Sequence, residues 1–237
     1  MENTLFSVNT GDNAWIMVST GLVFFMVPGL GFFYSGMAHT KNSLSPIILS
    51  FLSLAVVSVQ WTLFGYSLAF SETSANSFIG DFRYGLHLKV RGMMSIVAPK
   101  LPAITFSTFQ CMFAGITPAL SIGAVSERVR ILPTCVFFVL WTTFVYDFVA
   151  YWMWNPNGFL FKLGGLDFAG GTVVHINSGV SGFIFAHFIG KKLDYKEAPI
   201  SPNSVFNIAV GTSLLWFGFI GFNCGGNYSA DTVAGYA

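Results

Sequence analysis

The feature that most limits the fold of this chain is a series of six long apolar runs, separated by polar connectors. A helix crosses about 30 Å of hydrocarbon in roughly 17 to 25 residues, and each run is long enough to do so. The sequence therefore predicts an all-α fold, a polytopic membrane protein with one transmembrane domain over residues 1–237. We expect spans at approximately 14–34, 44–70, 103–125, 131–153, 168–189 and 205–223.

The charged residues avoid these runs. Only 9% of the residues are charged, against roughly 25% in an ordinary soluble domain, and nearly all lie in the connectors. A central Asp, Lys or Arg costs about 2.5 to 3.5 kcal/mol in a membrane helix, which explains the distribution. Lys and Arg are scattered and the formal net charge is +1, so we expect no nucleic-acid partner.

Neither the cysteines nor the N-terminus changes this interpretation. Cys111, Cys135 and Cys224 lie in apolar runs, where free cysteine behaves as a small hydrophobe, so we expect no disulfide framework, metal site or cofactor. Glu2 and Asp12 precede the first run, with no Lys or Arg. A cleaved secretory signal needs a basic segment there, so we expect a retained membrane helix.

Six spans place both termini on one side of the membrane, but the loop charges do not decide which side. The two sets of loops carry six and five basic residues, a difference too small for the positive-inside rule. The acidic, Lys-free N-terminus favours an external N-terminus. One set contains Lys41, Arg128, Arg130, Lys191, Lys192 and Lys196, and the other contains Arg83, Lys89, Arg91, Lys100 and Lys162.

His175 is the strongest candidate for function, because an ionisable side chain inside a span is rare and costly. Small residues at helical spacing fall near its face, so another helix can approach closely and the imidazole is expected to face protein or a cavity. A neutral imidazole there can hydrogen-bond a small polar solute. A structural histidine that bridges two helices is the alternative. The small residues are Gly171, Ser178, Gly179 and Gly182.

Two aspartates are ambiguous. Asp167 begins the fifth run, where a carboxylate caps free N–H groups; alternatively, its field helps to hold a cation at the mouth of a path. Asp147 lies about two turns before Trp154, close to the expected interface, where polar anchoring and function are both open. Other polar residues that could contact a solute are Gln60, Gln110, Asn177 and Asn223.

Aromatic residues form the other candidate group. Phe106, Phe109 and Phe113 share a helical face on the third run, Trp154 ends the fourth and Phe222 ends the sixth. Cation–π attraction of about 0.5 to 2 kcal/mol could select a small cation at such rings. Aromatic content of 17% also produces stripes by chance, and Trp and Tyr populate membrane interfaces in any case.

Taken together, these segments resemble the ammonium transporter family (Amt/Mep/Rh), and its Amt/Mep branch more than the Rh gas channels. The most specific segment is Asp167-Phe-Ala-Gly-Gly-Thr-Val-Val-His-Ile-Asn-Ser-Gly179. The supporting segments are Pro28-Gly-Leu-Gly-Phe-Phe-Tyr-Ser-Gly36, Gln60-Trp-Thr-Leu-Phe-Gly-Tyr-Ser-Leu-Ala-Phe70, Gln110-Cys-Met-Phe-Ala114, Ser126-Glu-Arg-Val-Arg130 and Trp216 to Asn223.

The resemblance implies a multi-pass plasma-membrane transporter, an N-out homotrimer with a path between two inverted halves in each subunit. It implies that Phe113 and Trp154 hold ammonium outside, and that Phe113 and Phe222 form a stacked gate. Asp167 matches a buried aspartate near that site, and His175 matches the first of two pore histidines. Gly226 stands where many members have a cation-binding serine, which implies a weaker recruitment site.

Length is the larger departure from the family, which has eleven spans. The resemblance covers its first six, so the second histidine and most of the second half lie outside this sequence. A truncated gene model or fragment is the favoured explanation; a product that pairs with a second polypeptide and a non-conducting remnant are the others.

The expected function is therefore transport: ammonium bound at the aromatic site and ammonia conducted past His175, with or without separate proton transfer. The alternative is a non-conducting fragment or a regulatory or structural membrane subunit. We do not expect an enzyme, because no acid–base pair or metal ligand set is evident: His39 and His87 lie in connectors, and His187 is about three turns from His175.

Overall fold

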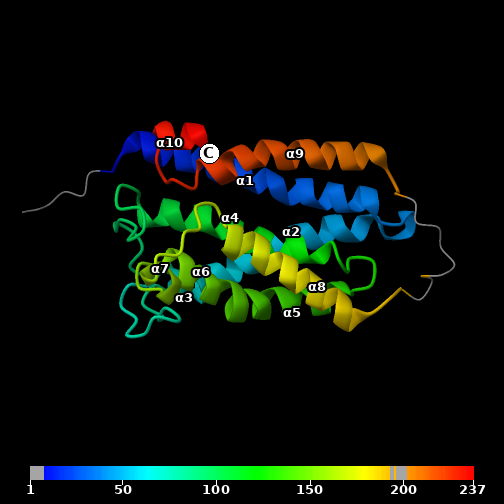
Figure 1. The fold of residues 1–237 in the computed structure, drawn as a ribbon, viewed down its shortest axis with the longest axis horizontal. Coiled ribbons are helices and arrows are strands. Elements are labelled where there is room, and N and C mark those ends of the chain that lie inside the picture. Colours follow the sequence, from blue (N-terminus) through cyan, green and yellow to red (C-terminus); the bar gives the residue numbers. More distant parts are fainter. Residues whose placement is uncertain (1–7, 193–194, 196–201) are drawn as a thin grey trace, which may run out of the picture.

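A computed structural model describes residues 8–192, 195 and 202–237 of the chain, and it is helical throughout its regular structure (Figure 1). Six of its helical segments are long and apolar enough to cross a membrane. The predicted all-α fold with six membrane helices is confirmed. Glu2 and Lys196, which entered the charge comparison, lie outside the described residues.

Three of the six spans contain a short π-helical segment, in which backbone hydrogen bonds reach one residue further than in an α-helix. The spans and the short elements between them are α1 (Thr10–Met37), η1 (Thr40–Asn42), α2 (Leu44–Gln60), η2 (Trp61–Gly65, π), α3 (Tyr66–Phe70), η3 (Gly85–His87), α4 (Ala103–Ile122), α5 (Ile131–Trp141), η4 (Thr142–Tyr146, π), α6 (Asp147–Trp154), α7 (Phe159–Lys162), η5 (Gly171–Ile176, π), α8 (Asn177–Ile189), α9 (Val205–Cys224) and α10 (Thr232–Tyr236).

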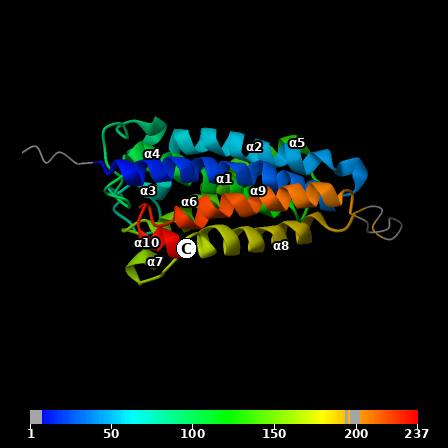
Figure 2. The same cartoon turned by 90° about the horizontal axis from the view of Figure 1, so that it is seen from above.

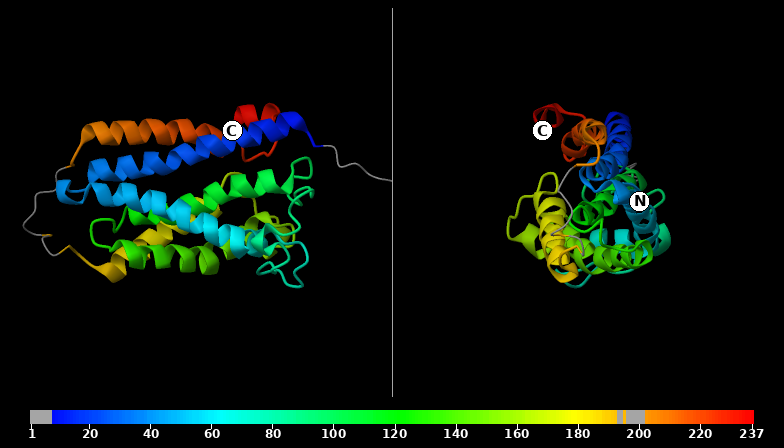
Figure 3. Two further views of the ribbon diagram at one scale, coloured as in Figure 1. Left: turned by 180° about the vertical axis from the view of Figure 1, so that it is seen from behind. Right: turned by 90° about the vertical axis from the view of Figure 1, so that its right-hand side faces the viewer.

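The spans run side by side along the long axis of the molecule (Figures 1 and 2). The start of α1, the connectors 71–102 and 155–170, and α10 gather at one end, which we call the loop-rich end (Figure 3). Trp15 Nε1 donates to the Cys224 carbonyl at 3.2 Å there. The connectors 38–43 and 123–130 lie at the other end, where Glu127 accepts from the His39 amide and pairs with Lys192.

The helices α1 and α9 lie against each other along most of their length, because glycines remove side chains from the contact. A Cβ added at Gly29 would lie 2.9 Å from the Leu214 Cβ. One added at Gly211 would lie 2.6 Å from the Gly29 carbonyl oxygen and also meet the Phe33 backbone. Small residues of this kind allow helix backbones to approach closely in membranes.

The fifth and sixth spans are the least covered. In the 18-residue apolar stretch of each span, 78% of the residues are buried in α4, but only 22% are buried in the span that contains α8 and in α9. Both helices lie at the rim of the bundle in the end-on view (Figure 3). Large apolar side chains such as Phe183 and Trp216 are about three-quarters exposed. We call the exposed side of η5, α8 and α9 the open face.

Candidate functional site

Phe113, at the middle of α4, lies between two other aromatic rings. Its ring centroid is 6.1 Å from that of Trp154, edge to face at 83°, and 4.5 Å from that of Phe222, tilted at 46°. The three rings come from α4, α6 and α9, and each residue is at least 92% buried. Three residues that are far apart in the sequence thus form one aromatic cluster.

His175 continues this series of rings toward the open face. It lies in η5, with its ring centroid 5.7 Å from that of Phe222 and 6.4 Å from that of Phe219. The residue itself is exposed, so the structure covers one side of the imidazole and leaves the other free. The sequence reasoning did not single out Phe219; its signal is the position one helical turn before Phe222.

Asp167 organises the start of the segment that carries His175. Its Oδ1 accepts from the Gly170 amide at 2.7 Å, and its Oδ2 accepts from the Thr172 and Val173 amides at 2.8 and 2.9 Å. These are the free donors of a helix N-terminus, where a carboxylate is also favoured by the helix dipole. The Asp167 carbonyl accepts from Trp154 Nε1 at 2.9 Å. One residue therefore connects the aromatic cluster to η5.

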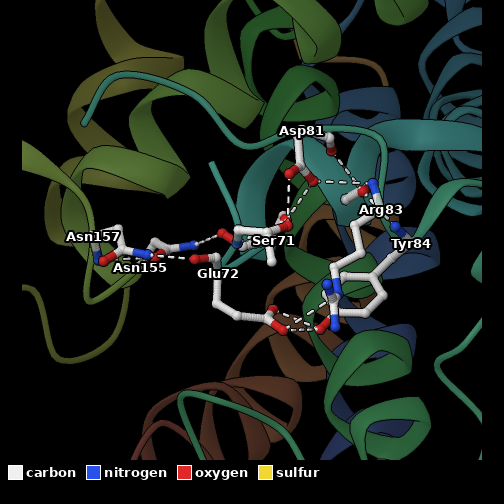
Figure 4. Close-up of polar contacts among 9 residues, drawn as sticks. Ser71, Glu72, Asp81, Arg83, Tyr84, Asn155 and Asn157 are labelled. Atoms are coloured by element: carbon white, nitrogen blue, oxygen red, sulfur yellow. Dashed lines mark hydrogen bonds and ion pairs between the residues drawn. The ribbon is translucent and has the colours of Figure 1, made fainter. Parts of the chain in front are cut away.

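A polar network in the connector 71–84 lies beside Asn155 and Asn157, which follow α6 (Figure 4). Ser71 and Thr73 donate to the Asp81 carboxylate at 2.5 and 2.6 Å, and these bonds hold the pKa of Asp81 below its usual value although burial opposes them. The Tyr84 hydroxyl donates to Glu72 at 2.5 and 2.6 Å. Burial, together with this bond and the charge of Glu72, raises the pKa of Tyr84 to about 12. Tyr84 thus remains a neutral donor at physiological pH.

Asn155 joins this connector to the end of α6, directly after Trp154. It is fully buried, and its Nδ2 donates to the Ala69 and Ser71 carbonyls at 3.2 and 3.0 Å (Figure 4). Its Oδ1 accepts from the Asn157 amide at 2.9 Å. The side-chain amide of Asn155 therefore holds the backbone next to Trp154 in the position in which the indole contacts Phe113.

Replacing Asn155 by alanine is expected to lower the free energy of unfolding by about 2 to 3 kcal/mol, because it leaves buried backbone groups without partners. Asn157→Ala is the matched control: Asn157 is partly exposed and its side chain donates to the Glu72 carbonyl, so a loss of about 1 kcal/mol or less is expected. Detergent-solubilised chains compared by denaturant unfolding give both values. Equal losses in the two variants would contradict the role of Asn155.

The remaining sequence candidates lie elsewhere. Gln60 binds Asp147, and Gln110 donates to the Tyr228 hydroxyl at 2.9 Å. Asp147 is fully buried within the bundle. The Phe106 and Phe109 rings face Tyr228, with centroids 5.2 and 6.3 Å from its ring. No sequence pattern singles out Tyr228.

The backbone at Gly226 is closely packed. A Cβ at this position would lie 2.8 Å from the Phe168 carbonyl oxygen and 3.2 Å from the Asn223 carbonyl oxygen. A larger residue at Gly226 requires the Phe168 segment to move.

Known proteins are similar to this chain along nearly its whole length. The family model described as Ammonium Transporter Family matches residues 14–237. Ammonium transporter 1 of Schizosaccharomyces pombe is 48% identical over 94% of this chain and 45% of its own length. Ammonium transporter MEP2 of Saccharomyces cerevisiae is 42% identical over 99% of this chain and 48% of its own length.

Solved structures give the same result. The crystal structure of Saccharomyces cerevisiae Mep2 superposes with a TM-score of 0.90 at 41% identity, and the match covers 97% of this chain and 51% of that one. The chain spans about half the length of the curated relatives it matches. The family model, the relatives and the fold together show that this multi-pass membrane chain belongs to the ammonium transporter family.

Proposed function

We propose that this chain forms the entrance half of a path for ammonium. Ammonium is held at Phe113 and Trp154 and loses its proton there, and ammonia passes Phe113 and Phe222 and continues beside His175. The observation that carries this proposal is the unbroken series of ring contacts from Trp154 to His175, with successive centroids 4.5 to 6.1 Å apart.

The physical chemistry of these residues suits a small cation at the outer end and a neutral molecule further in. Each aromatic face attracts a cation by about 0.5 to 2 kcal/mol, and the bond from Trp154 to the Asp167 carbonyl fixes the orientation of the indole. Stripping water from an ion in an apolar path costs far more than stripping it from neutral ammonia. The proton therefore leaves before the molecule passes the buried Phe222, and moves separately or stays outside.

The open face requires a second wall before the path is closed. His175 lies on that face, and the curated relatives are about twice as long as this chain. In this proposal, further membrane helices cover η5, α8 and α9, and the completed protein forms a homotrimer in the plasma membrane. The 237-residue chain alone is expected to give no uptake.

The test joins this chain to the second half of the Schizosaccharomyces pombe relative and measures uptake of labelled methylammonium in cells that lack their own ammonium transporters. His175→Leu is expected to lower uptake at least about tenfold, the equivalent of one net hydrogen bond of about 1.4 kcal/mol, and to change its pH dependence. Trp154→Leu is expected to raise the half-saturating concentration roughly 2- to 30-fold, as loss of one cation–π contact implies.

His187→Leu is the matched control, since His187 is exposed on α8 and its ring contact is to Phe188. Its uptake should equal that of the unsubstituted joined chain. Unchanged uptake and pH dependence in His175→Leu would contradict the role of His175. No uptake by the unsubstituted joined chain, at normal abundance in the membrane, would favour a non-conducting subunit.

A further inference from the structure

A second polar site lies inside the membrane-spanning part of the bundle, away from the aromatic cluster. Asp147, at the start of α6, is fully buried, and its Oδ2 accepts from Gln60 Nε2 at 2.8 Å. The same Nε2 lies 3.2 Å from Thr143 Oγ1. Gln60 ends α2 and is 2% exposed, so this pair connects the second span to the fourth. The proposed transport path uses neither residue.

Among the described residues, the carboxyl of Asp147 has no cationic partner to stabilise a negative charge. No Lys or Arg occurs in the sequences of α1 to α6, α8 or α9. Lys162, in α7, is exposed at the loop-rich end and donates to Ser77 Oγ. The titratable residues on the helices packed against η4 and α6 include Tyr66, Cys111 and His175. A buried carboxylate without a cation is costly, which favours the neutral form.

Each side chain of the pair has one oxygen that accepts no hydrogen bond from the described residues. Within the described part of the chain, Asp147 Oδ1 and Gln60 Oε1 are both buried and neither has a donor. They belong to the same carboxyl and amide groups that share the 2.8 Å bond. A carboxylate oxygen and an amide oxygen are both acceptors, so these two can share a hydrogen bond only if one of them carries a proton. The Thr142 and Tyr146 hydroxyl oxygens beside them in η4 are also buried and unpaired in this region.

A π-helical segment adjoins each residue of this pair in the sequence. Gln60 directly precedes the π-helical η2, and Asp147 directly follows the π-helical η4. Gly65, the last residue of η2, leaves room for the amide: a Cβ there would lie 2.6 Å from Gln60 Oε1 and 2.9 Å from its Nε2. Single π-helical turns within α-helices occur frequently at functional sites.

We propose that Asp147 and Gln60 form a proton-binding site within the membrane, with one proton held on Asp147 Oδ1. The protonated carboxyl donates through Oδ1 to an acceptor of this cluster, with Gln60 Oε1 as its partner, while Oδ2 accepts from Gln60 Nε2. Each side chain then donates one hydrogen bond to the other and accepts one from it, and no net charge is buried. The site is distinct from the ring series that ends at His175.

Infrared spectroscopy of the 237-residue chain tests this directly, with aspartate ¹³C-labelled at its side-chain carboxyl and the protein in an ester-free detergent at neutral pH. The unsubstituted chain is expected to show a label-sensitive C=O stretching band of a protonated carboxylic acid. Its intensity should correspond to one of the six aspartates. Asp147→Asn should remove the band. Asp12→Asn is the matched control, because Asp12 is also buried but accepts from the Ala230 amide, and it should leave the band unchanged.

Gln60→Met tests the partner of the proton separately. Loss of the amide should move the acid band to higher frequency without removing it, because the carboxyl keeps its proton but loses its hydrogen bond. If Asp147→Asn does not fold, the labelled unsubstituted chain with the Asp12→Asn control still decides whether a buried aspartate other than Asp12 is protonated. Absence of the acid band at neutral pH, or its survival in folded Asp147→Asn, overturns the proposal. An unshifted band in Gln60→Met overturns the assignment of Gln60.

Discussion

Replacing Asp167 by alanine is expected to destabilise the chain by about 3 to 4 kcal/mol. The substitution removes three hydrogen bonds from backbone amides to one carboxylate, and bonds to a charged group contribute about 1.5 to 3 kcal/mol each, with partial replacement by solvent at this half-buried position. The first turn of η5, which carries His175, then loses its cap, and the Asp167 carbonyl that accepts from Trp154 is held less firmly. Denaturant unfolding in detergent micelles measures the loss.

Two further variants make this result specific. Asp231→Ala removes a similar cap, since Asp231 accepts from the Val233 and Ala234 amides at the start of α10, but it is exposed and α10 has five residues. The denaturant concentration at which half of this variant is unfolded should therefore remain close to that of the unsubstituted chain. Asp167→Asn keeps an acceptor oxygen, so its loss of stability should lie between those of Asp167→Ala and Asp231→Ala. A loss in Asp167→Ala no larger than that in Asp231→Ala would show that the cap does not hold η5.

Replacing Gly211 by alanine is expected to have the second large effect. The added methyl group would meet the Phe33 backbone and the Gly29 carbonyl oxygen, and neither is the end of a flexible side chain. The helices α1 and α9 must therefore separate, at a cost of about 2 to 3 kcal/mol for overpacking a close contact. Thermal unfolding of the solubilised chain should show a lower midpoint.

Gly179→Ala is the matched control for Gly211→Ala. Gly179 also lies within a membrane helix, but a Cβ there meets nothing within 4 Å. Alanine favours a helix over glycine by roughly 1 kcal/mol, so this variant should be as stable as the unsubstituted chain or slightly more so. Equal destabilisation of both variants would indicate that helix contacts are not the cause.

The fold could be predicted from the sequence to a large extent because hydrocarbon thickness sets the length of each apolar run. The run predicted at 44–70 is one continuous helical span, Thr40–Phe70, in the structure. The π-helical segments could not be predicted, because the residues of η2 and η4 are ordinary apolar and hydroxyl side chains. In a π-helical turn the backbone hydrogen bonds join residues five apart instead of four. This change does not alter the amino-acid composition, but it changes which side chains face inward.

The sequence singles out the candidate residues one by one, but it does not predict which of them are in contact. Trp154, Phe113 and His175 stand out as residue types, whereas their order in one series of rings depends on the packing of α4, α6 and α9. Asp147 shows the limit most clearly. Its distance along the helix from Trp154 suggested the interface, but its partner Gln60 is 87 residues away in the sequence, and pairing between spans is decided by tertiary packing.

The close contact between α1 and α9 has a consequence for the order of assembly during synthesis. Gly29 and Gly211 are 182 positions apart (211 − 29), and a ribosome adds about 5 to 20 residues each second. The first helix therefore waits roughly 10 to 35 s in the membrane before its main neighbour emerges. During that interval its glycine surface can be occupied by lipid, by the insertion machinery or by a helix made between the first and the sixth span, so the docking of the sixth span must displace whatever has bound there.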